Sequence, residues 1–433
     1  MLSKELTLPF SKFFQKIPVL VFEILFWAII GFIFLGCANL FGQQGIFILI
    51  SIALMLVFVF LKSKLIINWP FILSCAFCLF YTLSAFIYDK DSLSSAFLYS
   101  IIFPVFILFF GTFEDKKKPL LWLLIAFIFG LFLSFLLMIL CTYWHQGASF
   151  NGDVLNTFWS SNVVTRTGLS LYEIGVIGVT LAALFFANKY RKWYTIPLML
   201  FTLLFCFYVS IMVGNRSFLI ALFVIIYVIL AFKMFQKEHD KFWTGVLVAY
   251  SVIFISFFVV YFLHYQGILI IPDELMRIKI INRLFSENIA RGRPEILQEF
   301  FSKFYMYPFG GLSQNMSNQY AHNLLLDFYT FGGVIPFAIG AVFFVFLFRY
   351  LYYFLHSKEH IRFEKVLLTC IIASIVGLGF IEPIYKANPN SVIPLFIVFL
   401  YIRSCVLSEN LIKSKAKQET KTKKLVTTRR KES

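Results

Sequence analysis

Long apolar runs alternate with short polar connections along almost the whole chain. Each run has roughly twenty residues, enough for a helix to cross the ~30 Å hydrocarbon layer of a bilayer. A β-barrel would instead show short segments of alternating hydrophobicity. The pattern predicts an all-α polytopic membrane protein with about twelve transmembrane helices, at residues 19–38, 45–61, 69–88, 97–113, 120–143, 172–188, 193–213, 217–232, 243–263, 332–355, 365–385 and 391–407.

The largest interruption of this pattern lies before the tenth run, and a loop of this length is usually functional. It contains two predicted helices, one after Pro272 and an amphipathic one from Pro294 that we expect to lie in the membrane interface. The chain is thus predicted to divide into an N-terminal arm (1–18), nine spans (19–263), the long loop with its helices (264–331), three more spans (332–407) and a basic tail (408–433).

Charge gives this layout an orientation. The chain is 60% hydrophobic, 14% charged and carries a net charge of +16. With the N-terminus inside, 28 of the 38 Lys and Arg residues fall in inner segments and 10 in outer ones. This is the positive-inside pattern, so we expect both termini in the cytoplasm and the long loop outside. Because the basic excess follows topology, it does not indicate a nucleic-acid partner.

Neither a disulfide framework nor a metal site is indicated. All seven cysteines lie in or beside apolar runs, and none lies in the long loop. Cys75 and Cys78 form a CxxC within an apolar run that has no second ligand pair, so packing is the expected role. The acidic residues are dispersed. We therefore expect no metal and no cofactor.

The outward-facing polar residues point to an anionic ligand. Among the arginines in predicted outer segments, four stand at candidate positions, namely Arg166, Arg216, Arg291 and Arg293. The planar guanidinium suits phosphate oxygens. On the same side lies His322, a residue type that moves protons near neutral pH, although a helix-capping histidine is the simpler interpretation.

Two glycine pairs flank this histidine. Gly310-Gly311 follows Pro308, and Gly332-Gly333 follows the apolar segment that the histidine opens. Glycine permits sharp turns and close backbone approach. Asp327 lies five residues after His322, about 140° around a helix, so it is not expected to orient the imidazole.

These motifs resemble the O-antigen ligase and O-antigen polymerase superfamily. The resemblance rests on Arg-Gly-Arg-Pro-Glu-Ile (291–296), Tyr-Pro-Phe-Gly-Gly (307–311) and the pair His322-Asn323. In the ligases a His-Asn pair is followed by nine residues, then Gly-x-x and Gly, Thr or Tyr. Gly333 fits this spacing, whereas Pro336 occupies the last position. Arg216 in a short outer turn and Arg166 before the sixth span also match, and the Arg166 segment favours the polymerases.

The resemblance implies a metal-independent glycosyltransferase of the bacterial cytoplasmic (inner) membrane. The donor would be a glycan on undecaprenyl pyrophosphate, and the acceptor a second lipid-linked glycan or lipid A core on the outer leaflet. Arg216 and Arg293 would stabilise the pyrophosphate leaving group, and His322 would orient or deprotonate the attacking hydroxyl. Arg166, Arg291 and Asn323 would contact substrate. A chain-length regulator or flippase is the expected protein partner.

Two other classes remain open at this point. A flippase for lipid-linked oligosaccharide would suit twelve spans, but should carry charges near mid-membrane and show related halves. A non-catalytic assembly factor would have no need of the histidine and arginines.

Overall fold

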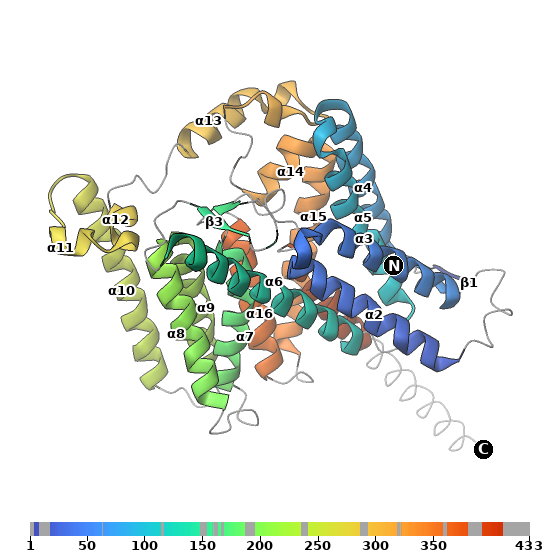
Figure 1. Cartoon of the computed structure of the whole chain (residues 1–433), viewed down its shortest axis with the longest axis horizontal. Helices are drawn as coiled ribbons and strands as arrows, with labels where there is room; N and C mark the ends of the chain where they lie inside the picture. The colour runs from blue at the N-terminus through green and yellow to red at the C-terminus, as the bar shows by residue number, and fades with distance from the viewer. Residues whose placement is uncertain are drawn as a thin grey trace, which may run out of the picture.

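The computed structural model describes residues 4–7, 18–62, 64–113, 117–147, 154–157, 159, 163–165, 169–186, 195–234, 241–285, 293–317, 321, 323–357, 362–379 and 392–409. Within these ranges the protein is a helical bundle (Figure 1). The first group of helices is α2 (Val19–Cys37), α3 (Gln44–Lys62), α4 (Trp69–Tyr88), α5 (Leu93–Gly111), α6 (Lys117–Gln146) and α7 (Ser170–Phe186). The second is α8 (Thr195–Val213), α9 (Arg216–Met234), α10 (Lys241–Tyr265), α14 (Leu324–Gly332), α15 (Val334–His356), α16 (Arg362–Gly379) and a last helix over Val392–Glu409.

These helices confirm the predicted class. In the described part of the chain, ten helices are long and apolar enough to cross a membrane. The other two predicted spans are also helical. However, α7 has only 17 residues, and α16 begins with three charged residues, Arg362, Glu364 and Lys365. The tenth predicted span, 332–355, corresponds to α15, and Gly333 separates it from α14.

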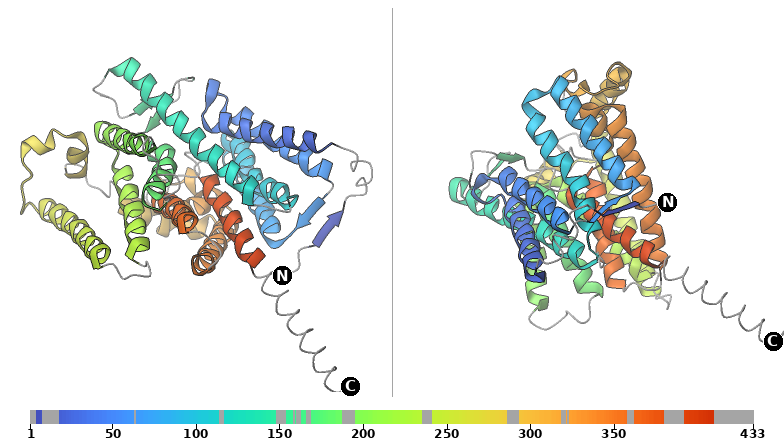
Figure 2. Two further views of the ribbon diagram at one scale, coloured as in Figure 1. Left: turned by 90° about the horizontal axis from the view of Figure 1, so that it is seen from below. Right: turned by 90° about the vertical axis from the view of Figure 1, so that its right-hand side faces the viewer.

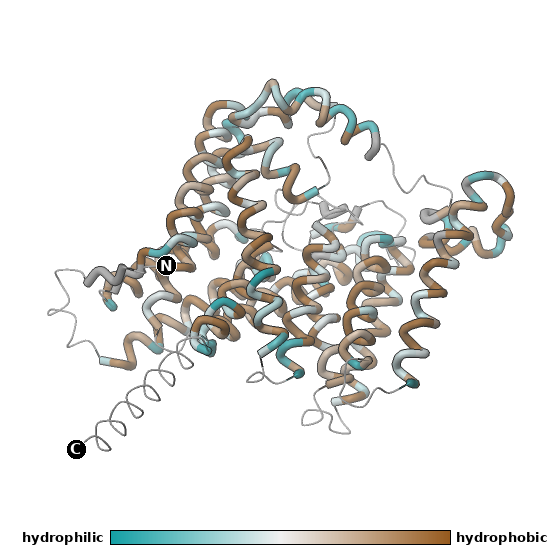
Figure 3. The backbone as a smooth tube through the Cα atoms, turned by 180° about the vertical axis from the view of Figure 1, so that it is seen from behind, coloured by the Kyte–Doolittle hydropathy of each residue, from teal (hydrophilic) through white to brown (hydrophobic). Residues whose placement is uncertain are grey.

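Many large apolar side chains are exposed on the bundle. Figure 3 shows that apolar residues, drawn in brown, make up most of the helices. Phe201, Val345 and Ile253 are each more than 60% exposed. An apolar surface of this extent suits hydrocarbon, not water. Several hydroxyl side chains within the helices bond to the backbone of their own helix; for example, Ser51 and Thr180 donate to carbonyls four residues earlier.

The helices pack in a continuous series. α4 pairs with α5, α5 with α3, α3 with α2, and α2 with α6, which leads to α7. α16 packs on both α7 and α9 in the middle of the bundle, with α8 and α10 beyond them and α14 and α15 against α4 (Figures 1 and 2). Phenylalanine fills much of the interior, including the fully buried Phe106, Phe109, Phe127 and Phe135.

Two short antiparallel strand pairs add to the all-α prediction. β1 (Lys4–Thr7) pairs with β2 (Lys64–Ile67), so residues 4–7 lie against the connection between α3 and α4. β3 (Val154–Asn156) pairs with β4 (Val163–Thr165) in the loop after α6. The Asn156 amide donates to Thr142 Oγ1 at 3.0 Å, which holds β3 to the end of α6.

The long loop carries three helices at one end of the bundle, called here the long-loop end. They are α11 (Asp273–Met276), α12 (Lys279–Phe285) and α13 (Arg293–Lys303). Two short 3-10 turns follow α13, at Phe304–Met306 and Leu312–Gln314. Two others lie earlier in the chain, at Leu40–Gly42 and Lys90–Ser92. Pro272 precedes α11, and α13 begins one residue before Pro294, as predicted. The opposite end, where the last helix finishes at Glu409, is called the tail end.

Candidate functional site

The amphipathic helix α13 packs on α14 through a small separate core, called here the loop core. Ile296 and Phe300 of α13 are 8% and 3% exposed. They pack with Leu312, Met316, Ala321 and Tyr329. The Tyr329 hydroxyl donates to the Phe304 carbonyl at 2.5 Å. The loop core thus joins α13, the 312–316 turn and α14 into one unit, and its member Ala321 is the residue directly before His322.

The two glycine pairs identified in the sequence meet each other in this unit. The Val334 amide donates to the Pro308 carbonyl at 2.8 Å. A Cβ on Gly333 would lie 2.4 Å from that same Pro308 oxygen and 2.6 Å from the Gly310 nitrogen. Gly333 has φ +81° and ψ −165°, a region that is essentially restricted to glycine. The predicted close approach and sharp turn are therefore both confirmed, and each pair fits the other.

The Pro308 turn also reaches α4. A Cβ on Gly310 would collide with Ser84 Oγ, and one on Gly311 with the Tyr88 ring. Ser84 Oγ donates to the Phe331 carbonyl at the end of α14. As a result, α4, α14 and the turn are locked together at the long-loop end.

The backbone is fixed on both sides of His322. Asn323 is the N-cap of α14, since its Oδ1 accepts from the amides of Leu325 and Leu326 at 3.1 and 3.3 Å. Asp327 reaches back, and its Oδ1 accepts from the Ala321 amide at 2.8 Å. The Asp327 amide in turn donates to the Asn323 carbonyl at 2.7 Å. Residues 321 and 323 are therefore both held by the first turn of α14.

Asp327 is an unusual carboxyl group. It is 2% exposed, and its Oδ2 is buried with no hydrogen-bond partner among the described residues. Burial raises its pKa to about 7, against a smaller opposing effect of the Ala321 amide. The spacing of five residues from His322 predicts that Asp327 does not orient the imidazole. The structure gives it a different contact, with the backbone just before that residue.

A second carboxylate ties α13 to the following turn. Glu299 accepts from Lys303 Nζ at 2.8 Å and from the Ser317 amide and hydroxyl at 3.1 and 2.5 Å. Lys303 also donates to the Asn315 carbonyl at 2.8 Å. The Lys303 and Ser317 hydrogen bonds lower the Glu299 pKa to about 2. The carboxylate form therefore holds the 312–317 turn against α13.

Arg216 is placed at the long-loop end. It is half-buried and is the first residue of α9, directly after the fully buried Asn215 and the positive-φ Gly214. Asn215 Oδ1 accepts from the Phe218 amide at 3.4 Å in the first turn of α9. A helix N-terminus carries a partial positive charge, which adds to that of the guanidinium.

Glu173, which no sequence pattern singled out, is a fully buried carboxyl group close to this turn. Its Oε1 accepts from Ser210 Oγ at 2.9 Å and from Asn215 Nδ2 at 3.4 Å. Its Oε2 has no hydrogen-bond partner within the described ranges. Glu173 thus joins the start of α7, just after the Arg166 segment, to the Arg216 turn. Glu173 is the fourth residue of the apolar helix α7. A carboxylate in such a helix is costly in lipid, so its presence in an apolar run could have identified it from the sequence as a residue with polar partners.

The remaining predicted site residues are only partly described. Arg166, Arg291 and His322 lie outside the described residues, and for Arg293 the structure describes only the backbone at the start of α13. Their neighbours do share one end of the bundle. α12 packs on α8 and α9, close to the Arg216 turn, and α13 lies over α14 (Figure 1). In the described residues, no group of three or more His, Cys, Asp or Glu is arranged to hold a metal ion.

In chemical terms, the described part of the long-loop end combines a cationic helix terminus with a buried carboxyl group that holds the Ala321 amide. No family model and no curated protein matches the chain.

Proposed function

We propose that this protein is a metal-independent glycosyltransferase of the bacterial cytoplasmic membrane. It transfers an oligosaccharide or polysaccharide from undecaprenyl pyrophosphate to an acceptor on the outer leaflet. Of the two reactions in the superfamily it resembles, polymerisation is favoured over ligation, because Pro336 departs from the ligase motif and the Arg166 segment matches the polymerases.

One observation carries this proposal. The motifs that support the resemblance are spread over residues 291–333, yet their described parts form one packed unit. The Pro308 turn fits Gly333, Asn323 caps α14, and Asp327 holds the amide before His322. A transferase needs such a fixed backbone, because a base that is misplaced by about 1 Å loses much of its effect.

The chemistry assigns a role to each group. The acceptor hydroxyl oxygen attacks the anomeric carbon of the donor sugar, and the bond from that carbon to the pyrophosphate oxygen breaks. His322 takes the hydroxyl proton. Arg216 and Arg293 stabilise the negative charge on the departing undecaprenyl pyrophosphate, as fixed cationic donors do. Arg166, Arg291 and Asn323 hold the glycans.

Reconstituted protein tests the proposal. His322→Ala in liposomes that contain a lipid-linked glycan is expected to slow product formation by about 10²–10⁴-fold. His356→Ala is a matched control at the tail end, where the His356 ring nitrogen contacts the Tyr352 carbonyl. Equal rates for the two variants would refute the role of His322.

The acceptor separates the two reactions. With lipid-linked glycan alone, a polymerase forms longer chains, whereas a ligase requires added lipid A core. Absence of product in both mixtures, with correctly folded protein, would refute the transferase.

Membrane orientation is a separate test. The charge asymmetry of the sequence supports an orientation with the long loop outside and the tail inside. A cysteine at Ser317 is expected to react with an impermeant reagent in intact cells, and one at Ser433 only after permeabilisation. The reverse result would refute both the orientation and an outer-leaflet reaction.

One observation favours a flippase as the second candidate. Glu173 is a fully buried carboxyl group in a predicted span, and such groups often serve proton-coupled transport. Glu173→Gln would then abolish the movement of lipid-linked glycan across vesicles. If the protein is a transferase only, the unsubstituted protein will itself leave that movement at the rate of protein-free vesicles.

A further inference from the structure

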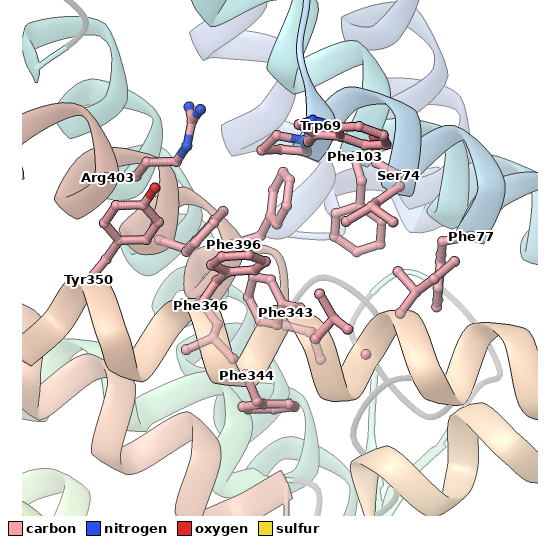
Figure 4. Close-up of a pocket in the computed structure, with 18 of the residues that line it drawn as sticks. Trp69, Ser74, Phe77, Phe103, Phe343, Phe344, Phe346, Tyr350, Phe396 and Arg403 are labelled. Carbon is pink, nitrogen blue, oxygen red and sulfur yellow. The ribbon is translucent and has the colours of Figure 1, made fainter. Parts of the chain in front are cut away.

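A long apolar groove lies between α4, α5, α15 and the last helix. Its cavity volume is about 590 Å³. Most of its lining is aromatic or aliphatic, and Figure 4 shows the phenylalanines that fill its middle, including Phe103, Phe343, Phe346 and Phe396. Trp69, Val342 and Leu407 line the groove and are 54%, 38% and 43% exposed. The groove therefore opens on the surface of the bundle, where the neighbouring molecules are lipids.

One end of the groove is polar. Arg403 and Tyr350 lie together there, with the guanidinium and the hydroxyl on the same side, and Phe77 lies toward the other end (Figure 4). Arg403 is half-buried and is the one charged residue among those that line the groove. A guanidinium beside a hydroxyl, with no carboxylate in the lining, suits a phosphate group.

The polar end lies at the tail end of the bundle. Trp69 begins α4, whose far end at Ser84 and Tyr88 contacts the Pro308 turn. Arg403 is likewise six residues from the end of the last helix at Glu409. A head group bound by Arg403 would therefore belong to the leaflet opposite the Arg216 turn. This position separates the groove from the pyrophosphate of the proposed donor.

The length of the groove fits one leaflet. Along α15 its lining extends from Ile339 to Tyr350. These eleven steps correspond to about 16 Å at 1.5 Å per residue. Half of a bilayer's hydrocarbon layer is about 15 Å. One acyl chain that starts at the Arg403 level would thus occupy the groove.

We propose that this groove is a binding site for one anionic glycerophospholipid of the tail-end leaflet. Its phosphate contacts Arg403 and Tyr350, and one acyl chain lies along Phe346, Phe343 and Phe396. The lipid fills the space between α15, α4 and the last helix. This inference does not depend on the proposed reaction.

Fluorescence quenching tests the site, because Trp69 stands at its polar end. The test uses a variant in which Trp69 is the sole tryptophan. The other six are replaced by Phe, namely Trp27, Trp122, Trp144, Trp159, Trp193 and Trp243. It is placed in phosphatidylcholine nanodiscs that contain an equal fraction of brominated phosphatidylglycerol or brominated phosphatidylcholine. The association constant from quenching is expected to be about fivefold higher for phosphatidylglycerol, the effect of one cation near a lipid phosphate.

Three variants identify the source of that preference. Arg403→Gln is expected to remove it. Arg349→Gln, the matched control, is expected to keep it, because Arg349 lies over the Tyr353 ring and outside the groove lining. Val342→Phe is the third variant. It adds an aromatic ring that fills the groove without adding a second fluorescent tryptophan to the variant that carries Trp69 alone. It should weaken quenching by both lipids even if Arg403→Gln fails to fold.

Each other outcome overturns the proposal. Equal quenching by the two lipids, or a preference that survives Arg403→Gln, would make Arg403 an interfacial anchor only. If unlabelled undecaprenyl phosphate restores the fluorescence and unlabelled phosphatidylglycerol does not, the groove holds a polyprenyl chain instead.

Discussion

Replacing Gly333 by alanine tests whether the Pro308 turn and the α14–α15 junction are built for each other. The alanine would keep φ near +81°, which costs about 1–3 kcal/mol for a residue with a Cβ. Its Cβ would also lie 2.4–2.6 Å from backbone atoms of residues 308–310, which cannot rotate away. The turn must therefore move, and the Val334–Pro308 hydrogen bond, a contribution of about 0.5–1.5 kcal/mol, is lost.

Together these effects predict that Gly333→Ala lowers the free energy of unfolding by about 2–4 kcal/mol. Equilibrium unfolding in detergent with added denaturant measures it, and hydrogen exchange at the Val334 amide reports the local opening. Gly31→Ala and Gly245→Ala are the controls. Both glycines lie within helices with open space at the Cβ position, so alanine should be neutral or stabilise by up to about 1 kcal/mol. If Gly333→Ala unfolds like these controls, the close fit is not what holds the turn.

Three other substitutions test charged groups at the long-loop end. Asp327 has a pKa of about 7 in the folded protein, above its usual value, so its ionisation lowers the free energy of unfolding as pH rises from about 4 to about 7, by about 4 kcal/mol. Asp327→Asn keeps an acceptor for the Ala321 amide but cannot ionise. Unfolding curves of this variant over the same pH range should therefore lack the decline. A decline of the same size in the variant would contradict the assignment. Glu299 has a lowered pKa of about 2, so its contribution to stability is present above about pH 4 and is lost toward pH 2. Glu299→Gln should therefore speed hydrogen exchange of residues 312–317 at neutral pH. Glu295→Gln, at an exposed position, is the control and should not. Arg216→Lys should lower the transfer rate without loss of membrane protein, since an ammonium cannot reproduce the fork; an unchanged rate would limit Arg216 to a surface charge.

The periodicity of the sequence was sufficient for most of the fold. The twelve apolar runs coincide with helices, and the proline rules placed the starts of α11 and α13 within a residue. These features depend on residues close in sequence, which hydropathy and helix-start signals capture. The break at Gly333 was indicated by the Gly332-Gly333 pair after an apolar segment and by the predicted start of the tenth span at residue 332.

Contacts between distant segments were beyond the reach of sequence patterns. β1 pairs with a strand that lies some sixty residues later, and neither segment alternates clearly enough to indicate its partner. Glu173 acquires its contacts with Ser210 and Asn215 only when α7 meets α8. The role of Asp327 depends on the loop folding back to bring Ala321 over the first turn of α14. The glycine pairs were recognised as sites of close approach, but not as partners.

The contact between Ser84 and Phe331 has a consequence for biosynthesis. The two residues are separated by 247 positions. At about 5–20 residues per second, roughly 12–50 s pass between their appearance on the ribosome. Throughout that interval α4 is present without the turn and the helix that complete it. Nascent chains that stop before α14 (Leu324–Gly332) therefore carry no assembled long-loop end, and any role of that end must wait until α14 has been made.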